Sequence, residues 1–260
     1  MISVALATHN EEKNLEKCLI AEKSWVDEII VADGESTDQT VEIAKKFGAK
    51  IISTTNKANF HINKQLAMNQ TTGDLVLQLD ADEVVDAELA TFIQHIDQKI
   101  DNPAAWWIRR KNFFMGRFLQ KGGQYPDPVI RLYRKGRAHL PQKDVHEQMA
   151  VDGEVGWAEG HLLHYSNPTF ADYMRKFNTY TSFKAHQLYE RETPITFFSS
   201  LQYLFWKPLV TFVSLFFIHK AFVTDGVPGF VFAVFSGLHH SFSYLKLWEI
   251  YEKANAKGRL

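Results

Sequence analysis

The sequence has a single cysteine, Cys18, so no disulfide can form within one chain of these 260 residues. It also lacks an excess charge of either sign, because 29 Lys and Arg stand against 30 Asp and Glu, and this balance argues against nucleic acid as a partner. The first residues read as a strand and contain neither the basic region nor the long apolar run of a secretory signal. These absences predict a cytoplasmic protein.

The first hundred residues alternate between apolar runs of strand length and segments with helical spacing. Strands are predicted at 2–7, 28–32, 50–53 and 75–79, and helices at 11–23, 37–47 and 59–70. Two further strands are predicted at 106–110 and 129–133, and the pattern is helical after Pro168. This alternation predicts an α/β fold with a mixed, mostly parallel sheet and helices on both of its faces.

Polar clusters stand where three of these strands end, at residues 8–11, 33–38 and 80–83. In parallel sheets, ligands bind beyond the carboxyl ends of the strands. Polar loops are common in any protein, but three such clusters at three strand ends favour a binding site.

The most informative cluster is Asp80-Ala81-Asp82-Glu83, which follows the apolar strand at 75–79 directly. Two neighbouring carboxylates repel each other unless a cation lies between them. Mg²⁺ and Mn²⁺ prefer such oxygen ligands and also bind the oxygens of a diphosphate. The alternative interpretation is an exposed acidic turn without a ligand.

These clusters resemble the loops of the family 2 glycosyltransferases, which are inverting enzymes of the GT-A fold. The resemblance rests on residues 8–11, 33–38 and 80–83 and covers roughly residues 1–165. Residues 166–260 are expected to form a separate helical region. The subgroup that assembles lipopolysaccharide core is the most similar, because it also carries a later His-Glu pair, here His146-Glu147.

The resemblance implies roles for individual residues. Asp82 would be the principal metal ligand, with Asp80 contacting ribose or metal, and Lys64 would face the diphosphate. Glu35 and Gln65 depart from the usual pattern and leave the preferred base and sugar open. The nucleoside pocket would be lined by Thr8, Asn10, Glu11 and Asp33, the last accepting a hydrogen bond from the base.

Inversion also requires a base that removes the proton of the acceptor hydroxyl. Glu147 is the candidate, and His146 could instead be the base or could orient Glu147. Arg131 could contact the diphosphate or the acceptor, since its guanidinium binds phosphate through two parallel hydrogen bonds. His164 could complete the metal site, whereas His161 is expected to be a core histidine. Trp106 and Trp107 are expected in the core rather than against a sugar ring.

The C-terminal region is rich in aromatic residues, but Lys207-Pro208 interrupts its apolar run. A bilayer span needs about 20 apolar residues, so a simple transmembrane helix is not predicted. Two helices joined near 224–229 could instead lie at the membrane surface. A dimerisation surface and a shallow re-entrant hairpin are the alternatives.

The sequence therefore predicts a metal-dependent inverting glycosyltransferase that moves a sugar from a nucleotide-diphospho-sugar, with UDP the common carrier, to a lipid-linked saccharide. It would work peripherally on the cytoplasmic face of the inner membrane. The rival hypotheses are a non-catalytic saccharide-binding module and a nucleotidyltransferase. The latter is disfavoured because the loop after the first strand has no glycine. The oligomeric state is left open.

Overall fold

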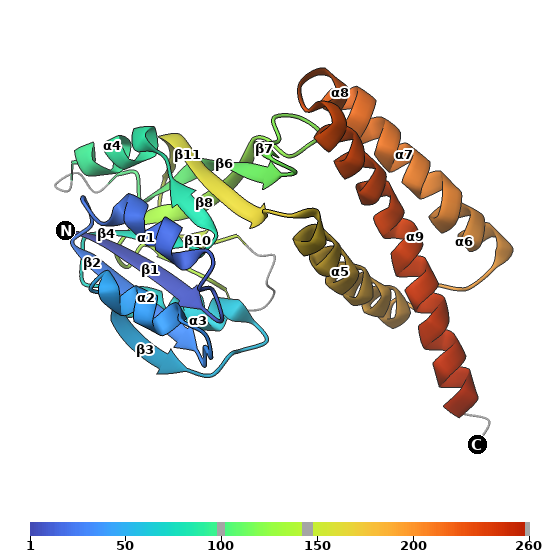
Figure 1. The fold of residues 1–260 in the computed structure, drawn as a ribbon, viewed down its shortest axis with the longest axis horizontal. Coiled ribbons are helices and arrows are strands. Elements are labelled where there is room, and N and C mark those ends of the chain that lie inside the picture. Colours follow the sequence, from blue (N-terminus) through green and yellow to red (C-terminus); the bar gives the residue numbers. More distant parts are fainter. Residues whose placement is uncertain (98–101, 142–147, 258–260) are drawn as a thin grey trace. The chain divides into compact units, whose positions relative to one another are not determined.

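The computed structural model describes residues 1–97, 102–141 and 148–257, and its contacts divide the chain into two compact units (Figure 1). The first unit contains Met1–Lys111 and Asp127–Tyr165, and the second contains Asn112–Pro126 and Ser166–Leu260. The first unit is built on a sheet, whereas the second is mostly helical.

A mixed sheet forms the centre of the first unit. Its strands are β1 Ile2–Thr8, β2 Glu28–Gly34, β3 Lys50–Thr54, β4 Leu75–Leu79, β5 Glu83–Val85, β6 Ala105–Phe114, β8 Asp127–Arg134 and β11 Val155–Asn167, with the short β7 Arg117–Phe118 paired to β6. The order across the sheet is β3-β2-β1-β4-β8-β6-β11-β5. Strands β3, β2, β1 and β4 are parallel, whereas β8 runs antiparallel to both β4 and β6.

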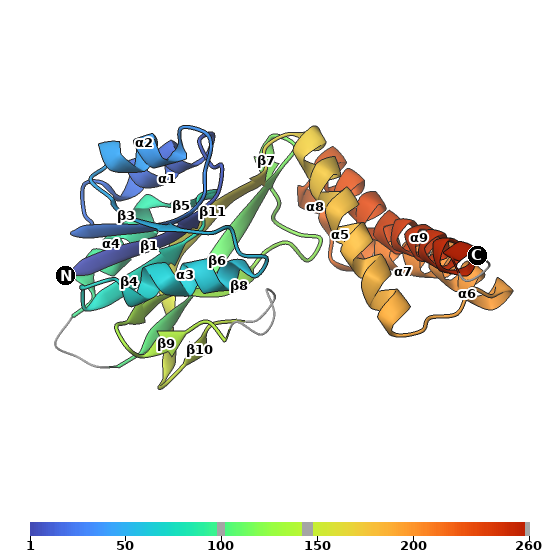
Figure 2. The same cartoon turned by 90° about the horizontal axis from the view of Figure 1, so that it is seen from below.

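Helices cover both faces of this sheet, as Figure 2 shows for α1 and α2 on one face and α3 on the other. Val4 and Leu6 of β1 face the larger core cluster, while Ala5 between them faces the other cluster. The predicted α/β fold is thereby confirmed. The helices are α1 Leu15–Glu22, α2 Thr40–Lys46, α3 Phe60–Asn69 and α4 Ala87–His95, and a small hairpin joins β9 Ala138–His139 to β10 Ala150–Val151.

Two helices begin later than their apolar spacing predicts. Helix α1 begins at Leu15 instead of residue 11, and α2 begins at Thr40 instead of residue 37. The residues before α1 instead contact the loop before α2, since the backbone N–H groups of Glu11 and Glu12 donate to Thr40 Oγ1 at 2.7 Å and Asp38 Oδ2 at 3.2 Å. The residues that could have extended α1 therefore tie two loops together at the edge of the sheet.

The second unit packs three long helical segments together. Its core joins Ala185 and Leu188 to Tyr244 and Leu247, and the ring of Tyr203 stacks on that of Tyr244 at a centroid distance of 5.0 Å. The segments are α5 Phe170–Glu190, the helix from Phe197 to Ile218 that contains α6 Phe197–Leu201 and α7 Lys207–Val213, and α9 Gly226–Lys257, which follows the short α8 Ala221–Thr224.

Lys207-Pro208 interrupts the apolar run of the sequence but not the helix, which continues through both residues. Pro208 lacks an N–H group and would clash with the preceding turn of a regular α-helix. Here a wider π-helical turn at Gln202–Trp206 comes directly before it, and such turns relieve that clash. The result is one helix, Phe197–Ile218, which by length and composition alone could cross a bilayer.

Candidate active site

The three polar clusters meet at one edge of the sheet. Thr8 at the end of β1 lies opposite Asp33 of β2, and Leu79 at the end of β4 lies opposite Leu6 of β1. Because these strands are parallel, Asp80 leaves the sheet on the same edge as Thr8 and Asp33.

The loops after β1 and β2 are held in place by their own side chains. Thr8 Oγ1 donates to Asp33 Oδ1 at 3.1 Å, and Asp33 also accepts from the backbone N–H of Ser36 at 3.0 Å. Asn10 Oδ1 accepts from the N–H of Thr37 at 2.8 Å. Both Asn10 and Glu35 adopt positive φ, a strained conformation that often occurs in binding loops. The two loops predicted to bind the nucleoside are therefore adjacent and hydrogen-bonded to each other.

Asp80 is engaged by two cations, one on each carboxylate oxygen. Lys64 Nζ lies 2.5 Å from Oδ1, and Arg131 Nη2 lies 2.7 Å from Oδ2. Burial acts to raise the pKa of Asp80, but the charges of Arg131 and Lys64 outweigh it and hold the pKa well below its usual range. Asp80 is therefore a carboxylate fixed by two ion pairs. It orients Lys64, which is predicted to face the diphosphate, and Arg131, which is predicted to contact the diphosphate or the acceptor.

Arg131 is the centre of this charge network. Besides Asp80, it contacts Glu83 Oε1 at 3.4 Å and donates to Gln78 Oε1. Glu83 is fully buried and also accepts from Arg110 Nη1 at 3.1 Å, and Arg110 in turn holds Asp127 at 2.8 Å. Burial acts to lower the pKa of Arg131, but the nearby carboxylates raise it above its usual value.

Asp82 and His164 lie together beside this network. His164 Nε2 is 3.5 Å from Asp82 Oδ2, and the neighbouring N–H of Tyr165 donates to the backbone oxygen of Asp82 at 2.8 Å. The pairing of β11 with β5 sets this arrangement, because His164 stands opposite Glu83. The carboxylate of Asp82 therefore lies against an imidazole, whereas that of Asp80 lies between two cations.

Two buried residues of α1 lie beneath the acidic turn. Cys18 Sγ is 3.8 Å from the backbone oxygen of Asp80, and burial raises the pKa of the Cys18 thiol well above its ordinary value. Burial also raises the pKa of Glu22 to about 8. Both groups are therefore protonated at neutral pH, and neither adds negative charge below the turn.

His146 and Glu147 lie outside the described residues, between β9 and β10 in the sequence. The hairpin is nevertheless tied to the site, since the N–H of Leu140 donates to Gln65 Oε1 at 2.7 Å. Gln65 is the neighbour of Lys64 on α3, and Met149 after the gap is buried in the same core cluster as α3.

His161 belongs to a different arrangement, away from Asp82. Its Nδ1 lies 3.0 Å from Asp86 Oδ2, and the other oxygen of Asp86 caps α4 by accepting from the N–H of Leu89 at 2.9 Å. Asp86, Glu88 and His161 bring their ligand atoms within 4.8 Å of one another. Asp86 is already used by the helix cap, so a structural role explains this group.

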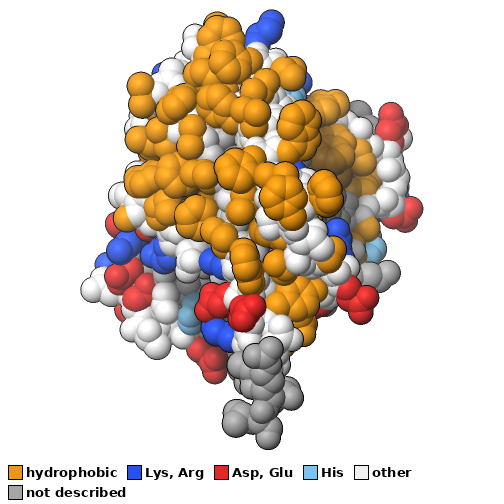
Figure 3. All heavy atoms as spheres, turned by 90° about the vertical axis from the view of Figure 1, so that its right-hand side faces the viewer, with side chains coloured by type: hydrophobic (Ala, Val, Ile, Leu, Met, Phe, Trp, Pro, Cys, Tyr) orange, Lys and Arg blue, Asp and Glu red, His pale blue; other side chains and the backbone are white. Residues whose placement is uncertain are grey.

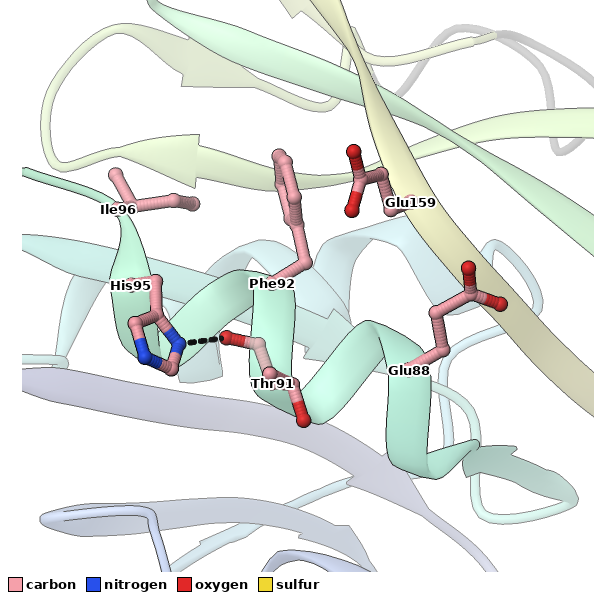
Figure 4. A pocket seen from close by; sticks show the side chains of 6 residues that line it. All are labelled: Glu88, Thr91, Phe92, His95, Ile96 and Glu159. Atoms are coloured by element: carbon pink, nitrogen blue, oxygen red, sulfur yellow. Dashed lines mark hydrogen bonds between the residues drawn. The ribbon is translucent and has the colours of Figure 1, made fainter.

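A surface pocket opens beside α4 and β11, with Phe92 and Ile96 forming its apolar part (Figure 4). Its rim includes Glu88, His95 and Glu159. None of the site residues predicted from the sequence lines it. Trp106 is buried in the core, as expected.

Comparisons with known proteins show the family to which the chain belongs. The family model described as glycosyl transferase family 2 matches residues 3–150. The chain belongs to this family. It is 30% identical to an uncharacterised glycosyltransferase of Rickettsia conorii over 88% of this chain and 83% of the relative. This family 2 glycosyltransferase is also 28% identical to the lipopolysaccharide core biosynthesis glycosyltransferase LpsC of Rhizobium meliloti, over 99% of this chain and 94% of the relative.

Solved structures give a weaker likeness. The crystal structure of S. aureus TarS 1–349 in complex with UDP covers 99% of the family 2 chain and 91% of its own, with a TM-score of 0.47 and 16% identity. The identification therefore rests on the family model and the sequence relatives.

Sequence reasoning missed part of the charge network in this glycosyltransferase. Glu83 was seen only as the end of the acidic cluster, and Arg110 and Asp127 were given no such role. One signal was available, because Gln78 is a polar residue inside the otherwise apolar strand Leu75–Leu79. A buried polar side chain needs a hydrogen-bonding partner, and Arg131 provides it.

Proposed function

We propose that this enzyme transfers a sugar from a uridine-diphosphate sugar to a lipid-linked saccharide, such as lipopolysaccharide core, with inversion at the anomeric carbon. The observation that carries the proposal is the arrangement of Asp82 and His164 beside the anchored Asp80. The name of the LpsC relative, which matches over nearly its whole length, supports the acceptor class.

On the donor side, the nucleoside would bind between the loops after β1 and β2. Thr8, Asn10 and Glu11 would line this pocket, and Asp33, held by Thr8 and Ser36, would accept the base N–H. Lys64 and Arg131, oriented by Asp80, would place positive charge toward the diphosphate.

A divalent cation fits the donor set of Asp82 and His164. A carboxylate oxygen and an imidazole nitrogen suit Mn²⁺, and Mg²⁺ would take the carboxylate with diphosphate oxygens. Both oxygens of Asp80 already face cations, whereas Asp82 faces the imidazole of His164. When bound, the metal would stabilise the negative charge that develops on the leaving nucleoside diphosphate.

On the acceptor side, Glu147 would take the proton of the acceptor hydroxyl as that oxygen forms its bond to the anomeric carbon and the bond to the diphosphate breaks. His146 would orient it. Replacing Glu147 with Gln should keep donor binding, because the side chain retains its shape, but lower transfer about 10²-fold to 10⁴-fold. Calorimetric titration with UDP and a product assay measure the two effects.

The companion change His146→Gln should reduce transfer less than Glu147→Gln does. Transfer by Glu147→Gln at the wild-type rate would remove that residue from the base role and leave His146 as the candidate.

The acceptor would be met at the membrane surface through the exposed side of the helix Phe197–Ile218. Phe198, Phe205 and Trp206 are 81%, 66% and 64% exposed, and the most apolar stretch of this helix is not buried in the protein. Figure 3 shows apolar side chains gathered over a broad area. Exposed apolar area of this extent indicates an interaction surface.

The position of Lys207 favours a helix that lies in the interface. Lys207 stands midway along Phe197–Ile218 with its ammonium 3.5 Å from the centroid of the Tyr203 ring. A crossing helix would carry that charge to the centre of the bilayer, whereas an interfacial helix lets it reach the headgroups. The enzyme would thus be peripheral on the cytoplasmic face of the inner membrane.

The double replacement Phe198→Ser and Phe205→Ser should weaken binding to vesicles of phosphatidylglycerol and phosphatidylcholine about 10-fold to 100-fold, since each ring would otherwise bury apolar area in the bilayer. Co-sedimentation measures this. Phe183→Ser, which removes an exposed ring from α5, is the matched control and should bind like the wild type. Unchanged vesicle binding together with conversion of a dimer into a monomer would assign the surface to self-association instead.

A further inference from the structure

Asp225 is a fully buried carboxylate between α8 and α9. It is the only acidic residue from 193 to 248, a stretch that contains the whole exposed apolar helix. Its Oδ1 accepts from the backbone N–H of Gln120 and its Oδ2 from that of Lys121, each at 2.8 Å. Burying a charge is costly unless it is well hydrogen-bonded, so this carboxylate depends on both donors.

Further contacts join the segment Asn112–Pro126 to the helices of the same unit. The N–H of Gly122 donates to the backbone oxygen of His219 at 3.1 Å, at the end of the exposed apolar helix. Gly122 has a φ of 62°, and a Cβ there would lie 3.2 Å from the side chain of Ala221. At the start of the segment, the buried ring of Phe114 packs edge-on against Tyr173 at 4.9 Å.

The two ends of this segment continue directly into the strands of the charge network. Residue 111 follows Arg110 of β6, and Pro126 precedes Asp127, the first residue of β8. Arg110 and Asp127 form an ion pair at 2.8 Å, and Arg110 also binds the buried Glu83. By contrast, the hydrogen bonds described above for Thr8, Asn10 and Asp33 remain within the loops after β1 and β2.

We propose that Asp225 is a positioning residue that couples the membrane-docking helix to the Asn112–Pro126 segment and thereby sets the acceptor side of the site. The coupling rests on the proposed membrane docking and on sugar transfer. It acts on the acceptor because the acceptor is held in the bilayer that the docking helix contacts, whereas the loops that would bind the nucleoside have their own hydrogen bonds. Weakening the hydrogen bonds from Asp225 to Gln120 and Lys121 should leave hydrolysis of the donor unchanged. It should lower the rate of transfer to an acceptor held in a lipid bilayer.

The test compares the full chain with Asp225→Asn, which keeps the shape but can accept through only one oxygen, and with Glu249→Gln. Glu249 is an exposed acid of the same helix α9, paired only with the nearby Lys253 at 2.6 Å in the described structure, and serves as the control. Three quantities are measured: co-sedimentation with phosphatidylglycerol–phosphatidylcholine vesicles, donor hydrolysis without acceptor, and transfer to a lipopolysaccharide extract in those vesicles. The donor is whichever of UDP-glucose, UDP-galactose and UDP-N-acetylglucosamine the wild type turns over.

For Asp225→Asn we expect vesicle binding and hydrolysis within about twofold of the wild type and a fall in kcat/KM for transfer of about 10-fold to 100-fold. Hydrogen exchange tests the two hydrogen bonds of Asp225 directly. In Asp225→Asn the amides of Gln120 and Lys121 should exchange faster, while those of α9 should exchange at the wild-type rate. Transfer at the wild-type rate, or hydrolysis that falls as far as transfer, would overturn the coupling. Wild-type protein that hydrolyses donor but does not sediment with vesicles would refute the docking, and the coupling with it.

Discussion

Replacing Asp82 with Asn should lower metal-dependent sugar transfer by about 10³-fold or more, which corresponds to roughly 4 kcal/mol of transition-state stabilisation. Asn keeps the size of the side chain but removes the negative charge that would hold a divalent cation beside His164. Activity is measured as a function of Mn²⁺ concentration after removal of metal with a chelator. The remaining activity of the variant should no longer depend on added metal.

Asp74→Asn is the matched control for this change. Asp74 is exposed and pairs with the N-terminal amine at 2.9 Å, just before β4 begins and hence at the other edge of the sheet from Asp82. It should leave transfer and its metal dependence unchanged. If Asp82→Asn kept a tenth of the wild-type rate and the same Mn²⁺ response, the metal would have to be held elsewhere.

Replacing Arg131 with Met should both destabilise the enzyme and impair donor turnover. Arg131 is the shared partner of Asp80 and the fully buried Glu83, and removing one member of a buried ion network typically costs about 3–5 kcal/mol. For a domain of this size that corresponds to a fall in Tm of roughly 6–20 °C. Asp80 would then be held by Lys64 alone, so the charges facing the diphosphate would lose their orientation. Thermal unfolding and the transfer assay measure the two effects.

Arg175→Met provides the comparison on the surface. Arg175 forms a similar ion pair with Asp172 at 3.0 Å, but its side chain is 72% exposed, and such pairs contribute only about 0–1 kcal/mol. A Tm of Arg131→Met within the range of this control would show that the buried network does not depend on Arg131. Arg131→Lys, which restores charge without the planar geometry, should fall between the wild type and Arg131→Met.

The sheet and its ligand edge could be predicted because they depend on local patterns. Strands such as Leu75–Leu79 are continuous apolar runs, and their ends mark the polar loops. The predicted helix starts were less accurate, and the contacts of Glu11 and Glu12 with side chains 29 and 26 residues away could not be predicted from local spacing. The π-helical turn that accommodates Pro208 could not be predicted, because such a turn leaves no simple sequence signal.

The charge network shows more clearly which features cannot be predicted from the sequence. Asp80, Asp82, Lys64 and Arg131 were each predicted at the site from motif and resemblance. Their pairings depend on the register between β4 and β8, where Leu77 lies opposite Leu132. A single sequence does not reveal that register, nor the contact of Asp225 with residues more than a hundred positions earlier.

The most direct test of the central claim is the position of bound metal in crystals soaked with UDP and Mn²⁺. Anomalous scattering should place one manganese ion in direct contact with the carboxylate of Asp82 and Nε2 of His164, bridging to the diphosphate. A manganese ion bound instead at Asp86 and His161, or UDP bound between the loops after β1 and β2 with no metal near Asp82, would contradict it.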